Sequence, residues 1–197
     1  REYQSLAAGA VFTDLSRVPG LFKDPAEVDC SRFPVRRGFA DLLAVVADEQ
    51  RLAGGPAWTA AVNTKEQWVW FAFRDPRVLP TTVFWIENRG RHGSPWNGRN
   101  NCLGLEDVCG FFAEGLVPSA APNALSKQGV RTALELDAAR PTEIRYAQGA
   151  VRVPAGFDRV KSIDFSAPGR ITLASHSGLT VAVPARHAFV MGAGQRP

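Results

Sequence analysis

The most constraining feature of this 197-residue sequence is a series of short apolar runs that recur about every ten residues. Turn-forming pairs such as Asn63-Thr64 and Asp75-Pro76 separate them. Many short, evenly spaced strands favour an antiparallel sandwich over an α/β fold. We therefore predict an all-β, mainly antiparallel protein with strands at 8–14, 58–62, 67–73, 81–87, 102–106, 130–136, 142–148, 157–165, 170–174, 179–183 and 187–191.

Two segments are expected to be helical. In residues 38–50 the apolar positions recur at helical spacing, which predicts the best helix of the chain. Residues 107–114 are expected to add one or two further turns. The apolar positions of the first segment are Phe39, Leu42, Leu43, Val45 and Val46.

Composition and charge limit the partners. The 23 basic and 19 acidic residues leave a net charge of +4, and the longest basic cluster is Arg36-Arg37. Nucleic-acid binding needs a basic patch, so we expect no nucleic-acid partner. No apolar run reaches the roughly 20 residues of a membrane span, so we expect no membrane partner. Three cysteines without zinc-ligand spacing predict reduced thiols in a cytoplasmic protein with no metal site.

We expect residues 1–197 to form a single β-sandwich domain. The sequence opens at Arg1 within what reads as the approach to a strand, so this domain is expected to be incomplete at its N-terminus. Unpaired strand edges in such a domain predict association, either with a second copy as a homo-oligomer or with the missing N-terminal half.

The stretch from residue 85 to residue 112 is rich in side chains that bind ligands. Sugars present apolar C–H faces and a ring of hydroxyls, so their sites combine a flat aromatic ring with Arg or Asn side chains. An aromatic edge of the core with solvated arginines is the alternative interpretation. The candidate substrate-binding residues are Trp85, Arg91, Trp96, Asn97 and Arg99.

Glu106 is the candidate catalytic carboxylate. Side chains alternate between the faces of a strand, so Cys102, Gly104 and Glu106 should share one face, with Leu103 and Leu105 on the other. The glycine should leave an open space beside the acid, as a substrate requires. The alternative is that Glu106 caps the short helix expected after it or pairs with Arg99.

The order of four segments in this chain resembles the C-terminal half of the aldose 1-epimerase (galactose mutarotase-like) family. These segments are WIENRGR, PWNGRNNCLGLEDVCGFF, PNAL and GVRTALELDAARPTEIRY. The resemblance implies a β-supersandwich of the galactose mutarotase-like type. It also implies acid/base interconversion of sugar anomers without a metal or cofactor, in which Glu106 takes the proton of the anomeric hydroxyl.

One feature of that family is absent from this sequence. The acid of the family lies in a His motif followed shortly by Tyr-Phe, far upstream of the Glu. Either the chain is a C-terminal portion, or His92 acts as the acid, or there is no mutarotase activity. Two alternatives remain: a non-catalytic sugar-binding β-sandwich module, and a hydrolase or lyase with a second carboxylate from Asp14, Asp24 or Asp29.

Overall fold

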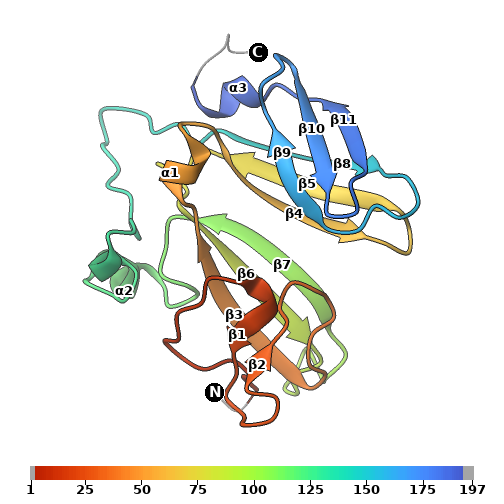
Figure 1. Ribbon diagram of the computed structural model, residues 1–197. Helices are drawn as coiled ribbons and strands as arrows, with labels where there is room; N and C mark the ends of the chain where they lie inside the picture. The colour runs from red at the N-terminus through yellow and green to blue at the C-terminus, as the bar shows by residue number, and fades with distance from the viewer. Residues whose placement is uncertain (1–2, 193–197) are drawn as a thin grey trace. The chain divides into compact units, whose positions relative to one another are not determined.

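The computed structural model describes residues 3–192, and the chain forms two compact units (Figure 1). The first unit contains the residues up to 46 and residues 81–133, and the second contains residues 47–80 and those from 134 onward. Within the described residues the strands of every sheet pair in antiparallel fashion. This confirms the all-β, mainly antiparallel fold class. The single domain expected over residues 1–197 stays a prediction.

The first unit is built on a three-stranded sheet in the order β3-β6-β7. One face of this sheet packs against the N-terminal segment, where Val18, Val28 and Cys30 join Leu43 and Ile86 in a buried apolar cluster. Its elements are η1 (Leu15–Arg17), β1 (Val18–Pro19), β2 (Glu27–Val28), β3 (Phe39–Val46), β6 (Thr81–Asn88), β7 (Asn101–Val108), α2 (Leu116–Ala120) and η2 (Ser126–Gln128).

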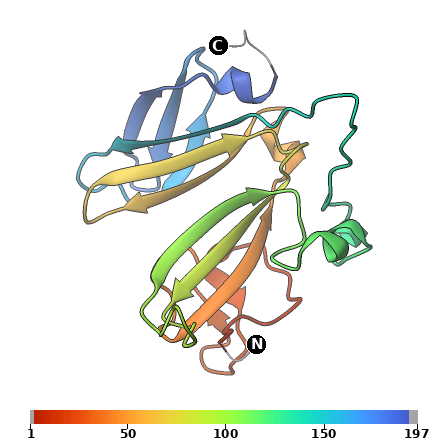
Figure 2. The same cartoon turned by 180° about the vertical axis from the view of Figure 1, so that it is seen from behind.

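The second unit is a small β-sandwich. Two three-stranded sheets, β4-β5-β8 and β9-β10-β11, contribute to one apolar core (Figure 2). Phe71 and Phe73 of β5 meet Ile171 and Leu173 of β10 there, and each of these side chains stabilises the fold by about 1.5–3 kcal/mol on burial. Its elements are α1 (Glu49–Leu52), β4 (Ala57–Asn63), β5 (Trp68–Arg74), β8 (Tyr146–Arg152), β9 (Val160–Asp164), β10 (Arg170–Ser175), β11 (Thr180–Pro184) and α3 (His187–Val190).

The predicted helix over residues 38–50 is wrong, because this segment is strand β3 from Phe39 to Val46. The strand pairs along its whole length with β6, and Leu43 on its inner face enters the core. Asp41 shares that face, and its buried carboxylate accepts hydrogen bonds from Ser5 N and Oγ at 2.7 Å and from Leu6 N at 3.0 Å. Pairing with β6, which is distant in sequence, therefore overrides the local helical pattern.

Other boundaries also differ from the prediction. No strand forms at 8–14 or 130–136, and the strand expected at 142–148 begins at Tyr146. Residues 107–114 form no helix, because β7 continues to Val108 and a turn follows. The strand expected at 187–191 is the short helix α3, which buries Val190 in the core of the second unit. No helix within residues 3–192 is long and apolar enough to cross a membrane.

Candidate functional site

One face of the β3-β6-β7 sheet gathers most of the candidate residues. Trp85 of β6 lies opposite Gly104 of β7, and Val83 lies opposite Glu106. Residues that are directly opposite in an antiparallel pair point to the same face, so Trp85 and Glu106 share one face. Leu103 packs into the core on the other face. The predicted alternation along residues 102–106 is therefore confirmed.

The expected open space beside Gly104 is filled. A Cβ atom on this glycine would lie 3.3 Å from Trp85 Cβ and 3.0 Å from Glu106 Oε1. The absence of a side chain at residue 104 thus lets the indole and the carboxylate approach each other across the strand. Glu106 itself is exposed, and it forms no hydrogen bond or ion pair with any described residue.

The loop from β6 to β7 folds tightly beside the sheet. Arg89 N donates to Asn100 O and Gly98 N donates to Arg91 O, both at 2.8 Å. A Cβ atom on Gly90 would overlap the backbone of Phe39 and Ala40, so only glycine permits this close approach to β3. The hydrogen bonds within the loop and the requirement for glycine at residue 90 together set the path of the loop.

A buried carboxylate organises the start of this loop. Glu87 is fully buried, and its Oε1 accepts hydrogen bonds from Gly90 N at 2.7 Å and from Arg91 N at 3.2 Å. Its Oε2 lies 3.7 Å from Arg91 Nε, an ion pair without a direct hydrogen bond. Glu87 therefore holds both the loop backbone and the arginine that follows it.

Arg91 is also held between two aromatic rings. Its guanidinium carbon lies 5.0 Å from the centre of the Trp85 ring and 5.5 Å from that of Trp96. The two indoles meet edge to face, with centroids 5.9 Å apart. Cation–π contacts of this kind contribute about 0.5–2 kcal/mol each. Among the described residues, Arg91 Nε, Glu87 Oε2 and Trp85 Nε1 are buried without a hydrogen-bond partner.

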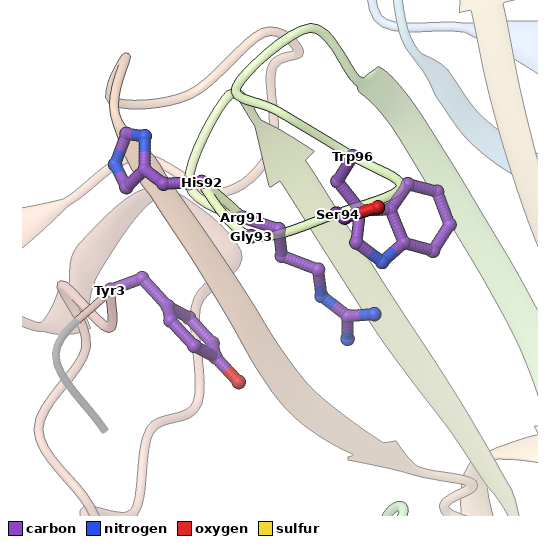
Figure 3. Close-up of a pocket in the computed structure, with 7 residues that line it drawn as sticks. Tyr3, Arg91, His92, Gly93, Ser94 and Trp96 are labelled. Atoms are coloured by element: carbon purple, nitrogen blue, oxygen red, sulfur yellow. The ribbon is translucent and has the colours of Figure 1, made fainter.

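A pocket of about 470 Å³ opens beside Arg91. Figure 3 shows Tyr3 and the Arg91 guanidinium on its sides with Trp96 nearby, whereas the His92 ring points away from that guanidinium. The lining residues are Tyr3, Gly90, Arg91, His92, Gly93, Ser94 and Trp96. None of them is acidic, so the pocket offers hydrogen-bond donors and a cation.

The structure thus brings together some sequence candidates and separates others. Trp85, Trp96 and Arg91 are in mutual contact, and Glu106 lies beside Trp85 on the same face. Asn97 and Arg99 are exposed and do not line the pocket.

A hydrolase or lyase would need a second carboxylate near Glu106, and the sequence offered Asp14, Asp24 and Asp29 as candidates. The structure gives two of these three residues other roles. Asp14 and Asp29 accept hydrogen bonds from Ser16 and Ser31, in the segment that packs on the opposite face of the sheet. Asp107, next to Glu106, accepts a hydrogen bond from Thr82 Oγ1 at 2.6 Å. It points to the opposite face from Glu106, because adjacent residues of a strand alternate.

Sequence reasoning missed Glu87 and Tyr3. A charged residue directly after the apolar run VFWI, in the same strand, is a signal for a buried and therefore partnered carboxylate, so Glu87 could have been found. Tyr3 carries no such signal, because only the tertiary fold brings it to the pocket.

No protein-family model, no curated protein and no solved structure matches this chain. Within residues 3–192 no group of three or more His, Cys, Asp or Glu side chains is placed to hold a metal ion.

Proposed function

We propose that this protein binds a sugar on the sheet face around Trp85, as a divergent relative of the aldose 1-epimerases. The observation that carries the proposal is the convergence of two indoles, a guanidinium and an exposed carboxylate on one side of the β3-β6-β7 sheet. An aromatic ring complements the C–H face of a sugar, and charged side chains hydrogen-bond its hydroxyls.

Glu106 is the base in the proposed reaction. Its carboxylate takes the proton from the anomeric hydroxyl while an acid protonates the ring oxygen, and the bond between C1 and the ring oxygen breaks. The open-chain aldehyde then turns about its C1–C2 bond, and the reverse proton transfers close the ring as the other anomer. Glu106 suits this role because it is exposed and has no partner among the described residues.

A non-catalytic sugar-binding module is the second candidate function. It is favoured by the orientation of His92, whose ring points away from the Arg91 guanidinium (Figure 3). With His92 in this position, the acid that the reaction needs would have to come from another group. A module of this kind would keep the aromatic and cationic contacts and show no turnover.

Two measurements on the same samples test the proposal. Calorimetric titration with D-glucose and D-galactose measures binding, and polarimetry measures the rate at which their anomers interconvert. We expect Glu106→Gln to retain binding and to lose turnover by a factor of about 100 or more, as removal of a general base does. Asp107→Asn is the matched control, because this neighbour points to the opposite face, and it should leave both quantities unchanged.

The outcomes separate the two candidates. Binding without accelerated anomerisation in the unmodified protein favours the module. Anomerisation at the unmodified rate by Glu106→Gln excludes Glu106 as the base. If no sugar binds at all, both candidate functions are wrong.

A further inference from the structure

The residues that line the pocket beside Arg91 supply positive charge and no negative charge. Arg91 and His92 line it together with Tyr3 and Ser94, which carry hydroxyl groups, and the lining contains no Asp or Glu. The loop between β6 and β7, residues 89–100, adds two more arginines and no acidic residue. A ligand that enters this pocket therefore meets donors and positive charge.

Arg91 is positioned as a donor before any ligand arrives. Its side chain is 34% exposed, although its Nε is buried. The indoles of Trp85 and Trp96 hold the guanidinium, and Glu87 lies on its buried side. Figure 3 shows the two terminal nitrogens pointing away from the loop backbone. These nitrogens form no hydrogen bond with any of residues 3–192.

A guanidinium held in this way suits one kind of acceptor best. Its planar fork of N–H donors matches two oxygens of a carboxylate or a phosphate, and such charge-assisted pairs are shorter and stronger than bonds to neutral hydroxyls. The buried Glu87 orients Arg91 without occupying its terminal nitrogens, because it is paired on the Nε side.

We infer that the sugar bound by this protein carries an anionic group, a carboxylate or a phosphate, that pairs with Arg91 in this pocket. The inference rests on the proposed function and specifies its ligand class. The sugar ring lies against the aromatic residues, and its anionic substituent lies against the guanidinium.

The test compares sugars that differ in charge, by calorimetric titration at low and high ionic strength. The probes are D-glucose, D-glucuronate and D-glucose 6-phosphate, with acetate and inorganic phosphate as anions without a sugar ring. We expect at least one anionic sugar to bind about tenfold or more tightly than D-glucose, which is the effect of one good charge-assisted pair. This preference should decrease as sodium chloride is raised.

Two variants locate the effect. Arg91→Gln should abolish the preference for the anionic sugar, so that D-glucose and its anionic derivatives bind this variant within about twofold of one another. Arg89→Gln removes the same charge from an exposed position in the same loop that does not line the pocket, and it should retain the preference. The comparison of probes needs no variant, so it remains decisive if Arg91→Gln does not fold.

Each outcome has one meaning. Equal affinity for neutral and anionic sugars overturns the anionic ligand class and leaves the proposed function standing. If acetate or inorganic phosphate binds as tightly as the sugar that carries the same anionic group, the inference of an anionic sugar ligand is overturned as well, since the sugar ring would then add no affinity. If none of the three sugars binds, the proposed function is overturned together with this inference. The carboxylate and phosphate probes identify which anion is preferred.

Discussion

Replacement of Glu87 gives the sharpest test of how the candidate site is built. In Glu87→Ala, the backbone N–H groups of Gly90 and Arg91 lose a carboxylate acceptor in a buried position. Hydrogen bonds to a charged group contribute about 1.5–3 kcal/mol each. The ion pair with Arg91 adds less than a fully buried pair would, because the Arg91 side chain is 34% exposed and solvent screens it. We therefore expect a total loss of stability of about 3–5 kcal/mol in the first unit.

The assay must report on the first unit alone. Trp58, Trp68 and Trp70 belong to the second unit, so tryptophan fluorescence would mix the two transitions. Amide hydrogen exchange along β6 reports the opening free energy of the first unit directly. Glu87→Gln keeps one carbonyl acceptor and loses the charge, so an intermediate loss of about 1–2 kcal/mol is expected.

Glu106→Ala is the matched control. It removes the same type of side chain from the same face of the same sheet, at an exposed position without a partner among the described residues. Its expected effect is within about 0.5 kcal/mol of zero. If Glu87→Ala lowered the opening free energy of β6 no more than this control, the structural role assigned to the buried carboxylate would be refuted.

Two further predictions concern backbone packing and pH. Gly90→Ala should lower the opening free energy in the same exchange assay by about 3 kcal/mol, because its Cβ would overlap the backbone of β3. Gly93→Ala, with open space around residue 93, should change this free energy by no more than about 0.5 kcal/mol. Equal effects of the two substitutions would contradict the packing argument. Burial, with help from Asp41 and Asp29, raises the pKa of Cys30 from 9.0 to about 12. The unfolded thiol ionises first, so stability present below pH 9 is lost between about pH 9 and 12, by roughly 2 kcal/mol at pH 10.5. In urea titrations, Cys30→Ala should reduce the loss of stability between pH 8 and pH 10.5. An unchanged loss in this variant would contradict the assignment of that pH dependence to Cys30.

The strands found from sequence are those whose local pattern and long-range pairing agree. Residues 58–62, 67–73, 81–87 and 102–106 lie within β4 to β7, apart from Gln67, which immediately precedes β5. Their aromatic and β-branched residues favour strands before any partner is known. Residues 39–46 show the opposite case, because their apolar residues fit a helix equally well until pairing with β6 decides the outcome.

Part of the candidate site was also accessible from sequence. Trp85, Arg91 and Trp96 were selected for their chemistry, and the structure places them in contact. The face of Glu106 followed from strand alternation alone. The orientation of His92 did not follow, because the path of a loop depends on turns and on the close approach of Gly90 to β3.

The sequence by itself determined the all-β class and the chemical inventory of the β6–β7 region, because both depend on residue types and on spacing of two along a strand. Only the tertiary structure decided the division into two units and the burial of Glu87 beneath Arg91. It alone also brought Tyr3 beside a loop almost ninety residues later in the chain. These features depend on contacts between segments that are distant in sequence, which no local pattern encodes.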